Sequence, residues 1–213
     1  MPDLAEAYVA QARGIRTDHW SGPPEMVDRI ARATRTARSH LVVDVGCGIG
    51  GPARRLALVT GCRVVGVDVV EKLVRLAGRR LSSGCVAFVA GAAEALPVRD
   101  GAADQVWCLG SVAHVPDLDA LTGEAARVLR RDGTLVVTEA FWEGREEPRF
   151  AAAAPQPWRP PTIGGLMSSA EAAGFRDVRA LPWPGWGMPE NVELARDIRD
   201  GVLRSHLVLA RRP

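Results

Sequence analysis

Short apolar runs, most of them rich in valine, alternate with amphipathic stretches from position 41 onward. Runs only a handful of residues long are typical of strands that are buried on both faces. The predicted strands are Leu41–Val45, Arg63–Val67, Cys85–Ala90, Gln105–Leu109 and Thr134–Thr138. The intervening stretches carry apolar residues at helical spacing and predict helices at Pro52–Thr60, Val70–Leu81 and Leu118–Arg130. This repeated order predicts an α/β fold, in which helices cover both faces of a doubly wound, mostly parallel sheet.

The sequence on either side of this alternating core has a different character. Before it, Glu25–Arg38 carries apolar residues on one face and arginines on the other, which predicts a helix. We therefore expect an N-terminal helical cap segment, residues 1–39, ahead of a single domain of residues 40–213. After the fifth predicted strand, Phe141–Pro161 is rich in proline and aperiodic, which predicts a loop or lid. Beyond it the pattern predicts a helix and two last strands, at Ile163–Ala173, Val178–Trp183 and Val202–Ala210.

The composition is that of a globular protein and argues against several other classes. With 27 basic and 25 acidic residues, the formal net charge of +2 is too small to indicate a nucleic-acid binder. No apolar run reaches about 18 residues, so we expect no membrane span, and the N-terminus lacks the pattern of a secretory signal. These features predict a cytoplasmic protein. The four cysteines form no C-x-x-C pair and are predicted to be small buried residues. The scattered histidines and carboxylates predict no metal site.

The strongest local signal is a glycine-rich turn that follows the first predicted strand. Residues 41–57 read LVVDVGCGIGGPARRLA, in which Gly46, Gly48 and Gly50 precede a predicted helix. Glycine supplies the positive φ angles that a sharp strand-to-helix turn needs, and it lets a ligand approach the bare backbone. Gly46, Gly48 and Gly51 also satisfy G-x-G-x-x-G, so the turn alone is compatible with a dinucleotide or with S-adenosylmethionine.

Two carboxylates help to distinguish these ligands. Asp44 lies two positions before the first glycine, and Asp68 closes the second predicted strand in the run VVGVDVV. A carboxylate at the tip of that strand can accept hydrogen bonds from both hydroxyls of a ribose. Asp44 would repel the diphosphate of a dinucleotide, whereas it suits a cationic ligand such as the ammonium group of a methionine moiety. The pair therefore favours S-adenosylmethionine.

Five sequence blocks in a fixed order carry a family resemblance. They are VDVGCGIGGPARRLA (43–57), GVD (66–68), GAAEALPVRDGAADQVW (91–107), LGSVAHVPD (109–117) and RVLRRDGTLVVTE (127–139). Over about residues 40–140 the chain resembles the class I S-adenosylmethionine-dependent methyltransferases, in particular the branch with sterol, tocopherol and natural-product methyltransferases. The resemblance implies a Rossmann-like sheet of seven strands with the last strand inserted antiparallel. It also implies S-adenosylmethionine as cofactor and S-adenosylhomocysteine as product.

The resemblance further implies a cofactor site along one edge of the sheet. The glycine turn would line the methionine and ribose part of the cofactor, Asp68 would hold the ribose hydroxyls, and Val69 would pack on the adenine. A pair of residues after the third strand would border the adenine, and a pair after the fourth strand would lie near the sulfonium. The expected cofactor residues are Asp44, Gly46, Gly48, Gly50, Asp68, Val69, Ala93, Glu94, Leu109 and Gly110.

A general base is needed in methyl transfer only where the acceptor must lose a proton. The catalytic candidates are His114 and Glu139. His114 follows the fourth predicted strand, where its imidazole can titrate near neutral pH or hold the loop through Asp117. Glu139 ends the fifth strand, where it either points into the same cleft or is a carboxylate that is solvated or paired with an arginine. Further candidates for the pocket wall or its closure are Tyr8, Trp142, Trp158, Trp183 and Trp186.

We therefore expect a methyltransferase that acts on a small molecule, in natural-product biosynthesis, as a monomer or homodimer without nucleic-acid or membrane partners. An alternative is a methyltransferase-fold enzyme that catalyses cyclisation or isomerisation instead. It is motivated by the short, proline-rich lid segment after the fifth predicted strand and by Ala92. Ala92 stands where relatives often have an acidic residue that binds the adenine amino group. A nicotinamide-dependent oxidoreductase would rest on the glycines alone, since Tyr8 and Lys72 are too far apart for its catalytic pair. A non-catalytic binding module would need an exposed apolar face that the sequence does not show.

Overall fold

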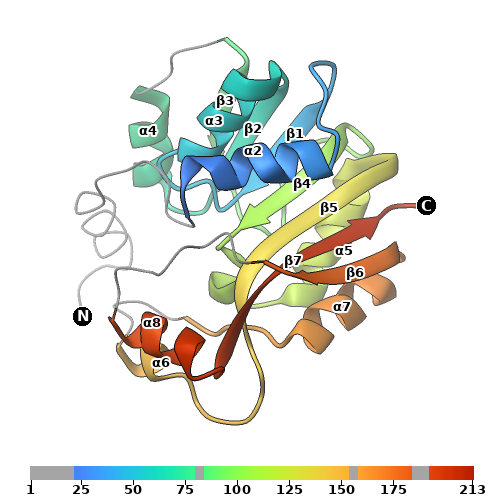
Figure 1. The fold of residues 1–213 in the computed structure, drawn as a ribbon. Helices are drawn as coiled ribbons and strands as arrows, with labels where there is room; N and C mark the ends of the chain where they lie inside the picture. The colour runs from blue at the N-terminus through green and yellow to red at the C-terminus, as the bar shows by residue number, and fades with distance from the viewer. Residues whose placement is uncertain (1–21, 80–83, 154–157, 184–191) are drawn as a thin grey trace.

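The computed structural model describes residues 22–79, 84–153, 158–183 and 192–213 (Figure 1). Seven strands in these ranges form one sheet in the order β3-β2-β1-β4-β5-β7-β6. The strands are β1 (Leu41–Val45), β2 (Arg63–Asp68), β3 (Val86–Ala90), β4 (Ala103–Leu109), β5 (Leu129–Trp142), β6 (Arg176–Pro182) and β7 (Leu203–Arg211). Strands β1 to β5 pair in parallel, whereas β7 runs antiparallel to both of its neighbours. The predicted fold class is confirmed, including the antiparallel last strand that the family resemblance implied.

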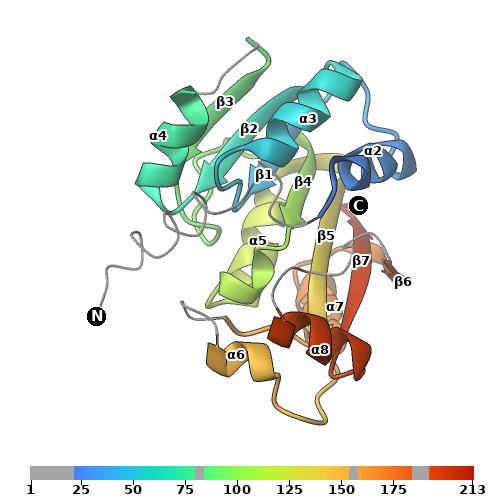
Figure 2. The same ribbon diagram turned by 60° about the vertical axis from the view of Figure 1, so that its left-hand side comes forward.

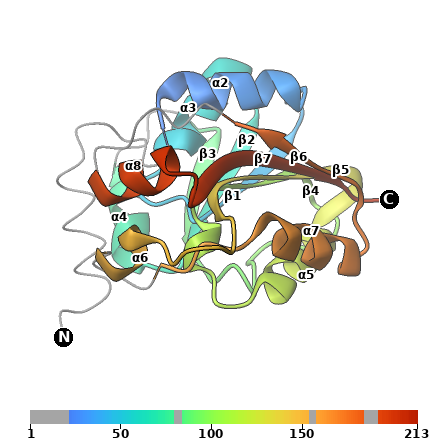
Figure 3. The same ribbon diagram turned by 60° about the horizontal axis from the view of Figure 1, so that its bottom comes forward.

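Helices cover both faces of the sheet, with α2 and α3 on one side and α5 and α7 on the other (Figure 3). The helices are α2 (Pro24–Ala33), α3 (Gly51–Thr60), α4 (Glu71–Arg79), α5 (Leu118–Val128), α6 (Arg149–Ala153), α7 (Ile163–Ala172) and α8 (Val192–Arg199). Successive side chains of a strand point to opposite faces. Accordingly, Val42 of β1 packs in an apolar cluster with α2 and α3, and Val43 packs in a second cluster with α5 and α7. This explains why the sheet strands read as continuous apolar runs.

The N-terminal helix is shorter than the amphipathic pattern predicted. α2 ends at Ala33, whereas the pattern predicted a helix as far as Arg38. The hydroxyl of Thr34 donates a hydrogen bond to the carbonyl oxygen of Ile30 at 2.9 Å, and Arg35 has a φ of +51°. A residue with positive φ cannot continue a right-handed helix. The periodicity continues past the helix end because it records which residues are apolar, not which backbone angles they adopt.

The region after the fifth predicted strand also differs from the prediction. β5 reaches Trp142, beyond the predicted end at Thr138, because β7 pairs with it residue by residue as far as Trp142 and Leu203. The segment predicted as a loop contains the short helix α6, and α8 was not predicted. α6 and α8 lie side by side beyond the end of β5 (Figure 2). Cys85 was predicted to be buried, but it is exposed because it lies in the turn before the edge strand β3.

The strand order places the loops that matter for function. β1 and β4 are neighbours at the centre of the sheet, and the chain leaves β1 toward β2 but leaves β4 toward β5. The loops that follow the two strands therefore diverge and leave a crevice at their carboxyl ends. This is the edge on which the sequence predicted the glycine turn and His114.

Candidate functional site

The glycine turn connects the end of β1 to α3. Its three glycines have positive φ angles, +72° at Gly46, +54° at Gly48 and +78° at Gly50. At two of them a side chain would also collide with a neighbour, because a Cβ on Gly46 would meet Ser111 and one on Gly50 would meet the ring of Phe88. These positions therefore require glycine for both conformation and packing.

The backbone N–H groups of this turn are used within the protein. Gly46 and Cys47 both donate to the carbonyl oxygen of Val67, at 2.8 and 3.1 Å. The N–H of Gly48 donates to Oδ2 of Asp68 at 2.8 Å. A dinucleotide-binding turn presents such donors to the pyrophosphate of its ligand. These three N–H groups are therefore engaged within the protein and do not point to a pyrophosphate ligand.

Asp44 is the most unusual polar residue of the site. It lies in β1 between Gly66 of β2 and Trp107 of β4, and its side chain is 3% exposed. Its Oδ2 atom has no hydrogen-bond partner in the described part of the chain. Burial, together with the nearby charge of Asp68, raises the pKa of Asp44 from 3.8 to about 7. Burying a carboxylate without a partner costs free energy, and a cation or a hydrogen-bond donor beside it would offset that cost.

Asp68 has a structural role that the sequence did not indicate. Besides accepting from Gly48 through Oδ2, its carboxylate accepts the N–H of Val70 through Oδ1 at 2.9 Å. Burial raises the pKa of Asp68, and these two hydrogen bonds oppose the rise. A carboxylate offers about four acceptor positions, so two remain for a ligand. Asp68 thus holds the glycine turn against the end of β2 and still faces the site.

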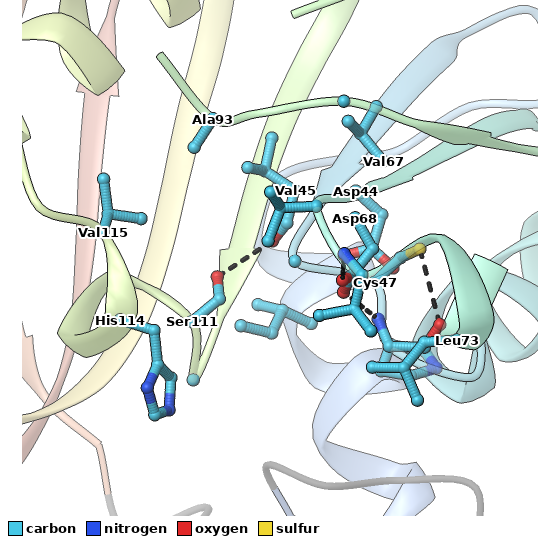
Figure 4. Close-up of a pocket in the computed structure, with 18 of the residues that line it drawn as sticks. Asp44, Val45, Cys47, Val67, Asp68, Leu73, Ala93, Ser111, His114 and Val115 are labelled. Carbon is cyan, nitrogen blue, oxygen red and sulfur yellow. Dashed lines mark hydrogen bonds between the residues drawn. The ribbon is translucent and has the colours of Figure 1, made fainter. Parts of the chain in front are cut away.

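These groups surround a cavity of about 340 Å³, in the range of small-molecule sites (Figure 4). Ten of the twelve predicted site residues line it: Asp44, Gly46, Gly48, Asp68, Val69, Ala93, Glu94, Leu109, Gly110 and His114. The two that do not are Gly50 and Glu139. The residues that the prediction missed are Val45, Cys47, Pro52, Val67, Val70, Leu73, Gly91, Ser111, Val115 and Pro116. Most of them adjoin predicted residues in the same strand-end loops, which is the signal that could have found them.

The opposite wall of the cavity comes from the loop after β4. In Figure 4, Ser111, His114 and Val115 lie on this wall, across from Asp44, Asp68 and Cys47. The hydroxyl of Ser111 donates to the carbonyl oxygen of Val45 at 2.8 Å, which ties the two loops together. His114 ends a short 3-10 turn, η1 (Val112–His114), and lines the cavity. Asp117 accepts the N–H of Ala120 through Oδ1 at 2.9 Å and caps α5.

Glu139 is near the site but lies behind its wall, so the expectation of a carboxylate in the cleft was wrong. Its side chain is 2% exposed, and its oxygens accept the N–H groups of Ala113 at 3.2 Å and Ala140 at 3.0 Å. Burial raises the pKa of Glu139 to about 7, although backbone hydrogen bonds lower it in part. Strand alternation turns this side chain toward η1, a direction that the sequence position did not reveal.

The chain is similar in sequence to known methyltransferases. Residues 43–137 match the family model described as a methyltransferase domain. Over 123 residues the chain is 35% identical to methyltransferase GfsG of Streptomyces halstedii, covering 56% of this chain and 44% of that protein. It is 38% identical over 114 residues to the sterol 24-C-methyltransferase of Eremothecium gossypii, covering 52% and 31%. The matched region, residues 43–137, is a methyltransferase domain of the class I S-adenosylmethionine-dependent family.

The structural similarity to known methyltransferases covers more of the chain than the sequence matches do. The geranyl diphosphate C-methyltransferase of Streptomyces coelicolor A3(2) superposes with a TM-score of 0.77 at 20% identity, covering 89% of this chain and 77% of that one. At this identity the likeness concerns the fold. The chain spans less than half the length of the curated relatives that it matches.

Three tryptophans of the predicted aromatic wall, Trp142, Trp158 and Trp183, are described, and they pack elsewhere. Trp158 packs with Ala113 and Leu203, and Trp183 packs beneath the guanidinium of Arg29. Trp142 donates its indole N–H to a backbone carbonyl oxygen. None of these three tryptophans lines the cavity. The candidates Tyr8 and Trp186 lie outside the described residues.

The described parts of the chain meet neither the requirements of a metal site nor those of a membrane-spanning helix. No group of three or more His, Cys, Asp or Glu residues within the described ranges is arranged to hold a metal ion. Among the helices of the described segments, none combines the length and apolar character that crossing a membrane requires.

Proposed function

We propose that this chain transfers a methyl group from S-adenosylmethionine to a small-molecule acceptor, as an enzyme of natural-product metabolism. The observation that carries the proposal is the cavity beside the glycine turn, in which Asp44 keeps a buried carboxylate oxygen without a partner. A cationic ligand fits this carboxylate better than an anionic one does. The names of the sterol and geranyl diphosphate relatives support a small-molecule acceptor.

The residues of the cavity fit the parts of this cofactor. The free acceptor positions of Asp68 suit the ribose hydroxyls. Val69 is 72% exposed beside the cavity, and a large exposed apolar side chain there suits the face of the adenine. Ala93 and Glu94 border the adenine in this arrangement. Ala92 carries no acidic group for the adenine, so Glu94 and backbone groups recognise it.

Methyl transfer requires the acceptor atom, the methyl group and the sulfur to be aligned, and it needs no covalent intermediate with the enzyme. When bound, S-adenosylmethionine supplies an electrophilic methyl group, whose bonding pair stays on sulfur as the acceptor bonds to carbon. Leu109 and Gly110 position this reaction at the end of β4 and exclude water with Val115. His114 accepts the proton that a hydroxyl or amine acceptor loses, because its ring lines the same cavity.

Further parts of the proposal concern the whole protein. The proposal keeps a cap segment of residues 1–39 ahead of a catalytic domain of residues 40–213. Of that segment, α2 (Pro24–Ala33) is a helix, and residues 1–21 lie outside the described residues. The protein works in the cytoplasm as a monomer or homodimer, without nucleic-acid or membrane partners. The near-neutral net charge supports the part of this proposal that concerns nucleic acid.

The experiment that tests the proposal is calorimetric titration of the purified protein with S-adenosylmethionine and S-adenosylhomocysteine, with NAD as the comparison ligand. Mass spectrometry first identifies any ligand that is retained through purification. Micromolar binding of the two sulfur ligands, and no heat with NAD, is the expected result. Absence of binding in ligand-free protein would refute the proposal. Binding followed by turnover of an acceptor without consumption of S-adenosylmethionine would favour the cyclase or isomerase alternative.

A further inference from the structure

We propose that Glu139 is a positioning residue, which holds the short turn η1 so that His114 stays at the wall of the cavity. The inference rests on the proposed function, since it assigns a role to His114 in the same site. Glu139 itself does not touch the cavity, so it acts through the backbone of η1 and not on the acceptor.

The contacts of Glu139 lead directly to this turn. Glu139 lies on β5 beside β4, the strand that leads into η1. Its Oε2 accepts the N–H of Ala113, the residue before His114, at 3.2 Å. Its Oε1 accepts the N–H of Ala140 at 3.0 Å, which orients the carboxylate on its own strand. The turn η1 is therefore hydrogen-bonded to a carboxylate whose orientation is fixed on β5.

A second hydrogen bond holds η1 from another part of the chain. The carbonyl oxygen of Ala113 accepts the N–H of Arg159 at 2.8 Å. Both backbone groups of Ala113 are thus bound by distant parts of the chain, the N–H by β5 and the carbonyl by the segment before α7. Within the turn, His114 donates its N–H to Ser111 at 3.1 Å, and Val115 donates to Val112 at 3.1 Å. Loss of Glu139 would remove the hydrogen bond to the N–H of Ala113 and leave the one to its carbonyl oxygen.

The burial of Glu139 makes its hydrogen bonds to backbone N–H groups important for its stability. A buried carboxylate is tolerated only when hydrogen bonds compensate its lost hydration. Here the partners are backbone donors, which carry no charge to pair with it. Glutamine could accept from one of these donors, but its NH₂ group would face the other. The geometry therefore predicts that Glu139→Gln retains part of the positioning and that Glu139→Ala loses it.

The experiment compares Glu139→Gln and Glu139→Ala with the unchanged protein by NMR and amide hydrogen exchange, both without ligand and with S-adenosylhomocysteine. The His114 ring signal is assigned by its loss in His114→Ala. We expect the Ala113 amide to exchange about tenfold faster in Glu139→Ala, with the glutamine variant in between. We also expect the His114 signal to move in the same order. The affinity for S-adenosylhomocysteine should change by less than about threefold, because the cofactor residues on β1 and β2 stay in place.

The matched control is Asp104→Asn. Asp104 is also a carboxylate that accepts a backbone N–H, from Leu41 at 2.7 Å, but it lies near the start of β4, whereas the cavity is at the carboxyl end of that strand. This variant should leave the His114 signal and the Ala113 amide unchanged. The proposal is overturned if folded Glu139→Gln or Glu139→Ala leaves both signals unchanged, or if Asp104→Asn moves them equally. The ligand-free spectra give this answer even if S-adenosylhomocysteine does not bind, so failure of the proposed function is distinguished from failure of this inference.

Discussion

The charge state of Asp44 makes ligand binding depend on pH in a defined direction. Asp44 is 3% exposed, and burial together with Asp68 raises its pKa to about 7. In the ligand-free protein the carboxyl is therefore about half protonated near neutral pH. A ligand with an ammonium group in this cavity favours the ionised form, so its binding should release protons. Binding should consequently tighten as the pH rises through 7.

The pKa also sets the size of the effect. With a pKa of about 7, about one Asp44 carboxyl in eleven is ionised at pH 6 and about ten in eleven at pH 8. If only the ionised form binds the ammonium group, the Kd falls about tenfold between pH 6 and pH 8. This corresponds to about 1.4 kcal/mol of binding free energy.

The assay is calorimetric titration with S-adenosylhomocysteine, which carries the ammonium group, at pH 6, 7 and 8. Repeating each titration in buffers of different ionisation enthalpy counts the protons that are released. Asp44→Asn should bind more weakly at pH 8 and lose most of the pH dependence. Glu139→Gln is the matched control, because Glu139 also has a pKa of about 7 but does not line the cavity. An equal Kd at pH 6 and 8 in the unchanged protein, or a slope that persists in Asp44→Asn, would refute the reasoning.

Three further predictions concern the same groups. Asp68→Ala should weaken the binding of S-adenosylhomocysteine in calorimetry by about 1–3 kcal/mol, and Asp68→Asn by less, because asparagine keeps one acceptor oxygen; unchanged binding would remove Asp68 from the site. His114→Ala should slow methyl transfer to a hydroxyl or amine acceptor by about 10²–10⁴-fold in a kcat assay, and a loss below tenfold would leave it a loop residue. The folded-state pKa values of Asp44 and Glu139 lie above their usual ones, so the ligand-free protein binds more protons folded than unfolded between about pH 4 and 7. Its melting temperature should therefore fall from pH 5 to pH 8, less steeply in Asp44→Asn, and a rise over this range would contradict both raised values.

Much of the fold follows from local patterns in the sequence. The valine-rich runs predicted β1 to β5 because strands buried on both faces must be apolar throughout. The glycine turn was predicted because a sharp turn with positive φ needs residues without a Cβ, and Gly46, Gly48 and Gly50 have such angles. The strand order was expected from the family resemblance, since periodicity within a strand carries no information about its neighbours. Most of the cofactor residues could be placed because each directly follows a predicted strand.

The tertiary structure decided what these residues can do, because their contacts join positions far apart in the chain. Gly46 must be glycine partly because Ser111 packs against it, and Asp68 anchors the turn through Gly48. The direction of Glu139 toward Ala113 depends on how β5 lies beside β4, which no local pattern records. Sequence periodicity reports the burial of an element, whereas pKa values, unpartnered atoms and cavity walls arise from packing between elements. The sequence by itself therefore determined the fold class and the edge that carries the candidate site, and only the folded chain determined which side chains face the cavity.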